Sequence, residues 1–145
     1  MTSLRPATAE DGGRLREWRN DPETVAASLT GRAVGAAEHA AWLARVLDDP
    51  DQRLFVVEDD GEPVGQVRLQ RHADGALEVH IGLAADARGR GLGRRTLELA
   101  WEQAGGGPLT ARVLADNERS LRAFAAAGFG ERSREGREIV LERRV

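Results

Sequence analysis

Arg88-Gly89-Arg90-Gly91-Leu92-Gly93 is the most informative stretch of this chain, and it joins a strand-like run to a helix-like run. Glycine adopts left-handed backbone at little cost, so three glycines in five positions let several N–H groups turn toward one point. The helix that follows adds its unpaired N–H groups and the positive end of its dipole. Such a corner binds phosphate. Four arginines, at positions 88, 90, 94 and 95, favour a polyanion as the occupant.

Two common phosphate-binding loops are excluded by the residues around these glycines. A Walker loop needs Gly-Lys-Ser/Thr, and this chain contains no lysine. A dinucleotide fingerprint needs Gly-x-Gly-x-x-Gly and an acidic residue about 20 positions further on, at the end of a strand. Here the glycines read Gly-x-Gly-x-Gly, and no strand carries such an acid. The loop is therefore of a different kind.

The loop resembles the Arg/Gln-x-x-Gly-x-Gly/Ala pattern of the GNAT superfamily of N-acetyltransferases, with Arg88, Gly91 and Gly93 in the defining places. Upstream, residues 77–83 resemble the central strand that precedes the loop in that family. Downstream, residues 111–129 resemble its last block, A-x-V-x3-N-x2-S-x3-(F/Y)-x3-G-F. Acetyl-CoA is the cofactor that this resemblance implies, with the loop amides on its pyrophosphate.

The front half of the chain suggests a branch of the superfamily. Trp18-Arg19-Asn20, Glu38-His39 and Trp42-Leu43 together resemble the branch that acetylates 4-amino sugars on nucleotide carriers. They resemble the ribosomal-protein and protein-terminus acetyltransferases more loosely. The resemblance thus predicts a small-molecule amine acceptor, most specifically a nucleotide-linked amino sugar.

Local patterns predict an α/β protein of the α+β type. Helices are expected from Thr8, over residues 36–48, after the glycine loop, and from Asn117 to a C′ residue at Gly128. Residues 22–35 read as a loop or broken helix. Strands are expected at 4–6, 54–58, 64–70, 77–83, 109–114 and 138–142. The GNAT fold implied has a mixed, mostly antiparallel sheet of six to seven strands flanked by about four helices.

Composition narrows the class of protein further. A length of 145 residues predicts one domain over residues 1–145, and a net charge of −3 gives no general attraction to nucleic acid or membrane. Cysteine is absent and the three histidines have no metal-ligand spacing, so no metal site is expected. The sequence shows no signal pattern and no apolar run near 20 residues, so a cytoplasmic location is expected.

The resemblance assigns cofactor-binding residues to three segments. The pantetheine arm would pair with the main chain of residues 81–83 like an added strand. The pyrophosphate would lie on the loop, and the helix that begins after Asn117 would reach the arm or a water beside it. The residues assigned to the cofactor are Ile81, Gly82, Leu83, Arg88, Gly89, Arg90, Gly91, Leu92, Gly93, Asn117, Ser120 and Phe124.

Glu78 and His80 are the candidate catalytic residues. They lie two apart on a strand, so their side chains share a face, and Glu78 matches a position that is the base in some relatives. The alternative is a solvated Glu78 and a hydrogen-bonded, partly buried His80. Many relatives have Tyr where this chain has Phe124, and the chain has no Tyr. Water or Ser120 would then serve the leaving thiolate, whose pKa of about 8.5 makes it a tolerable leaving group.

The acceptor is expected to lie against the two front helices, where Arg19 would bind a nucleotide phosphate and an indole would stack on the acceptor. The assigned residues are Trp18, Arg19, Asn20, His39 and Trp42; the alternative is that the tryptophans anchor the core. Two other functions stay open. One is the same chemistry on a protein or peptide amine, and the other is a non-catalytic acetyl-CoA-binding module, which the missing Tyr favours. A homodimer is also expected, since dimers are common among relatives.

Overall fold

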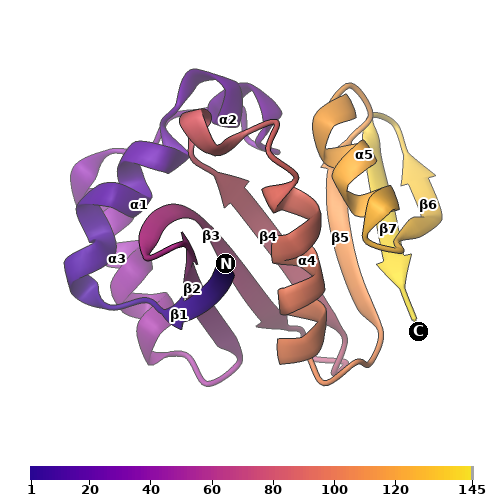
Figure 1. Ribbon diagram of the computed structural model, residues 1–145, viewed down its shortest axis with the longest axis horizontal. Helices are drawn as coiled ribbons and strands as arrows, with labels where there is room; N and C mark the ends of the chain where they lie inside the picture. Colours follow the sequence, from indigo (N-terminus) through magenta and orange to yellow (C-terminus); the bar gives the residue numbers. More distant parts are fainter. Residues whose placement is uncertain (145) are drawn as a thin grey trace.

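The computed structural model describes residues 1–144 and contains a seven-stranded sheet with helices on both faces (Figure 1). The sheet order is β1-β2-β3-β4-β5-β7-β6, and every neighbouring pair is antiparallel except β4 with β5. The strands are β1 Thr2–Pro6, β2 Gln52–Asp59, β3 Glu62–Arg71, β4 Leu77–Leu83, β5 Leu109–Leu114, β6 Gly130–Glu135 and β7 Glu138–Arg143. The helices are α1 Gly12–Arg19, α2 Pro22–Ala27, α3 Ala36–Asp48, α4 Leu92–Gln103 and α5 Glu118–Ala126, with short 3-10 turns η1 Ala9–Asp11 and η2 Ala85–Ala87.

Alternation along β3 and β4 gives the sheet two different faces. Val67, Leu69 and Val79 are buried in the larger apolar cluster, together with Leu97 and Ala100 of α4. The residues between them, such as Arg68 and Glu78, face the side of α1 and α3. A second, smaller cluster lies on that side and packs α1 and α3 against β2; it contains Ala7, Leu15, Leu43, Val46, Leu54 and Val56.

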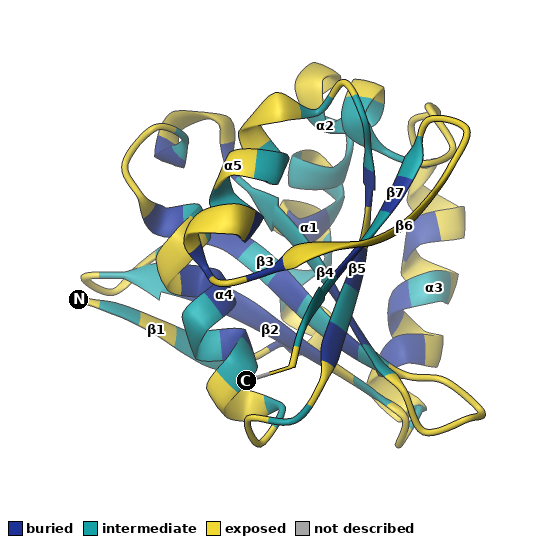
Figure 2. Cartoon of the chain, turned by 90° about the vertical axis from the view of Figure 1, so that its right-hand side faces the viewer, coloured by how far each residue is buried: buried dark blue, intermediate teal, exposed yellow. Residues whose placement is uncertain are grey.

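The smaller cluster does not extend across the whole sheet. Its sheet residues belong to β2, so the middle of β3, β4 and β5 carries polar side chains on this face, namely Gln66, Arg68, Gln70, Glu78, His80, Thr110 and Arg112. In Figure 2 the helix α3 shows a buried stripe on one side and an exposed surface on the other. This open polar face is where the candidate site lies.

Residues 22–35 were expected to be a loop or broken helix, and the broken helix is what forms. The short helix α2 begins there because Asp21 caps it by accepting from the Thr24 amide and Pro22 occupies its first turn. The same residues that end α1 therefore begin α2. The strand β6 was not placed from the sequence, because it has only exposed residues and a register shift between Glu131 and Ser133, and therefore no apolar alternation (Figure 2).

The other predicted elements are confirmed, and the bounds of α3, β4 and β5 are those predicted. Asn117 caps α5 by accepting from the Ser120 amide at 3.3 Å, and Gly128 follows the helix with φ 91°. Within the part of the chain that the structure describes, no helix has the length and apolar character needed to cross a bilayer.

Candidate active site

Strands β4 and β5 form a fork at the centre of the sheet. Their parallel pairing covers only Leu77 with Leu109 and Glu78 with Thr110. Beyond Glu78, β4 continues to Leu83 without β5 as a partner on that edge, and in Figure 1 the two strands diverge toward the end of the molecule where α2 lies. The edge of β4 at residues 81–83 is therefore open to pairing with an extended ligand, although the Leu83 carbonyl already accepts from the Arg88 side chain at 3.2 Å.

The glycine loop continues directly from the open end of the fork. Gly89 and Gly91 have φ values of 77° and 74°, and a side-chain carbon at either position would have open space around it. Gly91 is the N-cap of α4, and among residues 1–144 no side chain caps the amides that follow it. Gly93 has a different role, because a side-chain carbon there would lie 3.2 Å from Cβ of Ala123. Two glycines thus shape an exposed anion corner, and the third lets α4 pack closely on α5.

The side chain of Arg88 does not extend into this corner. Its Nη2 donates to Asp21 Oδ2 at 2.9 Å, to Thr24 Oγ1 at 2.9 Å and to the Leu83 carbonyl at 3.2 Å. The side chain is only 13% exposed, so it is a structural link between α2 and the end of β4. The pKa of Asp21 is lowered, with Arg88 as the main cause. Only the backbone of Arg88 is left to serve the predicted phosphate site.

The other three loop arginines are exposed and have carboxylate partners within the chain. Arg90 contacts Asp59 at 3.1 Å, while Arg94 and Arg95 share Glu98 at 3.0 and 3.5 Å. Exposed pairs of this kind contribute about 0–1 kcal/mol, so they are easily exchanged for a stronger anion. These three arginines therefore remain compatible with a phosphate ligand, although the folded chain already gives each a partner.

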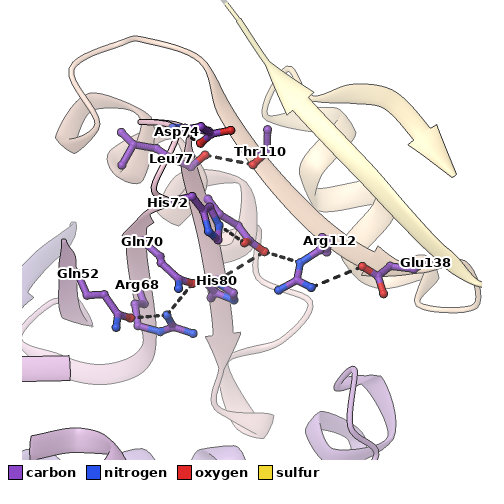
Figure 3. A network of polar contacts seen from close by, with 12 residues as sticks. Gln52, Arg68, Gln70, His72, Asp74, Leu77, His80, Thr110, Arg112 and Glu138 are labelled. Atoms are coloured by element: carbon purple, nitrogen blue, oxygen red, sulfur yellow. Dashed lines mark hydrogen bonds and ion pairs between the residues drawn. The ribbon is translucent and has the colours of Figure 1, made fainter. Parts of the chain in front are cut away.

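Glu78 and His80 share the polar face, as predicted. Figure 3 shows the polar network around His80, with His72 and Arg112. Glu78 is buried, and its carboxylate accepts from His72 Nε2 at 2.7 Å and from Arg112 Nε at 2.8 Å. Burial raises the pKa of Glu78, but Arg112, His80 and His72 together outweigh it and the pKa is lowered. Glu78 is thus an ionised carboxylate held between the two strands of the fork.

His80 lies 3.7 Å from Glu78, and its Nε2 is 3.1 Å from Gln70 Oε1. Burial, followed by the neighbouring charge of Arg68, lowers its pKa to about 4. His80 is therefore neutral at pH 7. Because both neighbours of Nε2 are oxygens, we assign the proton to Nε2, which leaves the lone pair on Nδ1.

Arg68 and Arg112 are site residues that the sequence did not reveal. Arg112 bridges Glu78 of β4 and Glu138 of β7, at 2.8 and 3.6 Å. Arg68 is paired with His80 across β3 and β4, and its Nη1 donates to Gln52 Oε1 at 2.6 Å and Gln70 Oε1 at 3.2 Å. The alternation of polar residues on β3 signalled an exposed face, but only the strand register shows that this face is the one that carries Glu78.

The predicted acceptor residues on the front helices are only partly brought together. His39 is buried and its ring lies 5.2 Å from that of Trp42, which in turn lies 5.6 Å from the Arg68 guanidinium. The pKa of His39 is lowered by burial and then by Arg16 and Arg19. These contacts link α1, α3 and β3 on one face of the sheet.

Trp18 and Asn20 have structural contacts. Trp18 packs against both apolar clusters, which favours the core interpretation for this residue. The Asn20 side chain donates to the Val34 carbonyl at 2.8 Å and accepts from the Val34 amide at 2.7 Å, so it fixes the segment before α3. Arg19 Nη2 contacts Thr30, whereas its Nη1 is buried and has no hydrogen-bond partner among the described residues.

On α5 the cap and the aromatic residue are both structural in this molecule. The Asn117 side chain bonds the Ser120 amide, and Phe124 is buried with its ring edge-on to Phe129 at 5.0 Å. Phe124 therefore lies in the core, where a phenylalanine needs no polar partner. No tyrosine exists elsewhere in the chain to supply a phenol.

A family model described as "Acetyltransferase (GNAT) domain" matches residues 2–130. The chain belongs to the GNAT acetyltransferase family. The predicted fold class is confirmed, and the predicted enzyme class and cofactor are those of this family, whose members transfer acetyl from acetyl-CoA to amines. The match includes β4, the glycine loop and α5, which are the segments that carry the resemblance.

One relative is the mycothiol acetyltransferase of Clavibacter michiganensis subsp. michiganensis (strain NCPPB 382). The two sequences are 34% identical over 137 residues, which is 90% of this chain and 44% of that protein. This GNAT chain thus spans less than half the length of that relative.

Solved structures share the fold at low sequence identity. Aminoglycoside acetyltransferase AAC(6')-Ib in complex with coenzyme A superposes with a TM-score of 0.87 and 20% identity, covering 99% of this chain and 95% of that chain. Spermidine N-acetyltransferase from Vibrio cholerae, in complex with CoA and spermine, has a TM-score of 0.85 and 18% identity over 97% of this chain and 94% of its own. These likenesses show that the GNAT fold extends over nearly the whole chain.

Proposed function

We propose that this protein transfers the acetyl group of acetyl-CoA to the primary amine of a nucleotide-linked amino sugar, by direct attack in a ternary complex. The observation that carries the proposal is the fork between β4 and β5, with the glycine loop at the start of α4 directly after it. Family membership supports the reaction. The front-half motif and the arginines around it support a phosphate-bearing acceptor.

The chain has features that fit acetyl-CoA. Gly89 and Gly91 leave open space beside their left-handed backbone, and the first amides of α4 have no side-chain cap. The open edge of β4 offers the main chain of Ile81, Gly82 and Leu83. When bound, acetyl-CoA supplies an activated thioester. The loop amides would hold its pyrophosphate, and a backbone N–H near Leu83 would polarise its carbonyl, a type of contact worth about 2.7–4 kcal/mol in acyl transfer.

Glu78 and His80 are the groups we assign to proton removal. An alkylammonium has a pKa of about 10, so a base assists attack at neutral pH. The ionised Glu78 carboxylate would accept the proton through water, and neutral His80 offers Nδ1 as a second acceptor. The amine of a 4-amino sugar is less basic than that of lysine, so its need for a strong base is smaller.

The leaving thiolate would be served by water or by the Ser120 hydroxyl, because Phe124 is in the core and the chain has no Tyr. On the acceptor side, Arg19, His39 and Trp42 are the residues we assign, with Trp18 and Asn20 holding the two front segments in place. Residues 1–145 as one domain, a homodimer, a cytoplasmic location and the lack of nucleic-acid, membrane and metal partners stay predictions.

Thiol release from acetyl-CoA with a panel of acceptors tests this function. The panel contains UDP-linked 4-amino-4,6-dideoxy sugars, a ribosomal-type N-terminal peptide, a lysine peptide and a polyamine, with product mass as confirmation. We expect turnover on the nucleotide sugar. Turnover confined to a peptide would overturn the acceptor class and keep the cofactor site. Binding of acetyl-CoA without turnover on any acceptor would favour the non-catalytic module.

A further inference from the structure

Arg68 is a half-buried cation on the polar face of the sheet, and it forms no direct ion pair among residues 1–144. No carboxylate of the described residues lies within 4 Å of its guanidinium, and its hydrogen-bond partners are the neutral amides of Gln52 and Gln70. Burial lowers the pKa of Arg68. Glu78, the nearest acid of the network, is engaged by Arg112. A buried charge of this kind is costly unless something pairs with it.

The guanidinium is held in place, yet part of it is unused. Both amides contact Nη1 alone, and the ring of Trp42 lies 5.6 Å from the guanidinium carbon (Figure 3 shows the amide contacts). Nε and Nη2 of Arg68 have no hydrogen-bond partner among residues 1–144. Neither atom is fully buried, so both can be reached from solvent. Two parallel donors are therefore fixed and accessible, which is the geometry that binds carboxylate or phosphate bidentately.

The surroundings of Arg68 add to its positive charge. The charges of Arg16 and Arg19 of α1 lower the pKa of His39, whose ring lies tilted against that of Trp42, and neither arginine has a carboxylate within 4 Å in the described chain. His80 lies beside Arg68 and is neutral at pH 7. This face therefore disfavours a polycationic acceptor and favours an anionic one.

We propose that Arg68 is the anion-binding group of the acceptor site, and that the acceptor amine carries a phosphate or carboxylate that binds to its Nε and Nη2. This inference rests on the proposed N-acetyltransferase function and adds to it a residue and a chemical class. Arg68 lies across from His80, so the anion would be bound next to the groups assigned to proton removal.

The test compares amines that differ only in charge. Glucosamine 1-phosphate is paired with methyl glucosaminide, and β-alanine with its methyl ester, in wild type, Arg68→Gln and Arg71→Gln. Arg71 is the matched control, because it lies on the same strand but is exposed and points to the opposite face, and its side chain donates to the Gly75 carbonyl. The measured quantity is the ratio of kcat/KM for the charged over the uncharged amine.

We expect wild type to prefer the phosphate-bearing amine. Arg68→Gln should reduce that preference by about 10- to 100-fold, the effect of losing hydrogen bonds to a charged group, while Arg71→Gln preserves it. A preference for β-alanine that is lost in Arg68→Gln would support Arg68 and overturn the nucleotide sugar as acceptor. Equal use of the charged and uncharged amines by wild type, or the same preference in Arg68→Gln as in wild type, would overturn the inference.

If no acceptor is acetylated, binding of glucosamine 1-phosphate tests the anion site of Arg68. The chain has three histidines, so the His80 signal can be followed by NMR as glucosamine 1-phosphate is added in the presence of acetyl-CoA. A saturable shift in wild type and in Arg71→Gln that is absent in Arg68→Gln would support the anion site without acetyl transfer. No shift in wild type would overturn it.

Discussion

The two faces of strands β3, β4 and β5 are made from alternate residues of the same segments, but they differ in chemistry. On the side of α4, Val67, Val79 and Leu109 are at most 2% exposed and pack into the main core. On the side of α1 and α3, Arg68, Glu78 and His80 form a hydrogen-bonded polar network. The difference indicates that one face supplies most of the stability, and that the other is free to carry charge and function.

Replacing one residue on each face of β5 gives the largest contrast. Leu109→Ala should reduce the free energy of unfolding by about 2–5 kcal/mol, because Leu109 is fully buried and its loss leaves a cavity. Thr110→Ala, on the opposite face, removes only the 3.1 Å bond to the Leu77 carbonyl and should cost about 0.5–1.5 kcal/mol. Urea denaturation of both variants measures the difference. Equal losses would contradict the division of roles between the faces.

Removing the carboxylate of Glu78 tests the functional face. Glu78→Gln should lower kcat by about 10²-fold or more if Glu78 takes the proton, while acetyl-CoA binding is retained. Unchanged turnover with intact binding would show that Glu78 is not the base.

Arg112→Gln is the control that separates the charge of Glu78 from its packing. Arg112 lowers the pKa of Glu78, so its removal should shift the acidic limb of the kcat profile to higher pH. If Arg112 and Glu78 have only a structural role, Arg112→Gln should change kcat without shifting the acidic limb of its pH profile.

Adding a side chain at Gly91 tests whether the glycine loop binds the cofactor. Gly91→Ala should weaken acetyl-CoA affinity by about tenfold, because the new carbon occupies the open space through which a phosphate approaches the backbone. Gly136→Ala is the matched control: Gly136 also has positive φ and open surroundings, but it lies in the β6–β7 turn. Calorimetric affinities for coenzyme A within twofold of each other in the two variants would contradict the assignment.

The dependence of stability on pH tests the burial of His80 on the polar face. The folded-state pKa of His80 is about 4 and its ordinary value is 6.5, so between these values the unfolded chain binds more protons. Stability is therefore complete above pH 6.5 and is lost as the pH falls toward 4, and the lowered pKa of Glu78 acts in the same direction below pH 4.5. His80→Gln should show a smaller loss between pH 6.5 and 4. The same slope in both proteins would show that burial of His80 does not control it.

Local sequence patterns were sufficient for most of the fold. Helical spacing gave the bounds of α3, and the glycines together with Asn117 gave the starts of α4 and α5. The strand β6 could not be found in this way, because its only ladder is with β7 and all its side chains are exposed. The strand forms because β7 lies beside it in the folded chain, and not because its own charged sequence favours a strand.

The sequence predicted only those features of the site whose residues lie close together in the chain. The glycine loop and the shared face of Glu78 and His80 follow from short spacings. The partners of Glu78 do not, because Arg112 lies 34 residues away and meets it through the pairing of β4 with β5. The engaged side chain of Arg88 was missed for a similar reason, since its partners belong to α2.

Hydrogen–deuterium exchange with and without coenzyme A tests most directly whether the fork between β4 and β5 holds the cofactor. Coenzyme A should slow exchange in residues 81–83 and 89–93, which form the open edge of β4 and the glycine loop with the start of α4. Peptides from β6 and from the β6–β7 turn should be unaffected. Protection elsewhere, with the fork and the glycine loop unchanged, would contradict the account.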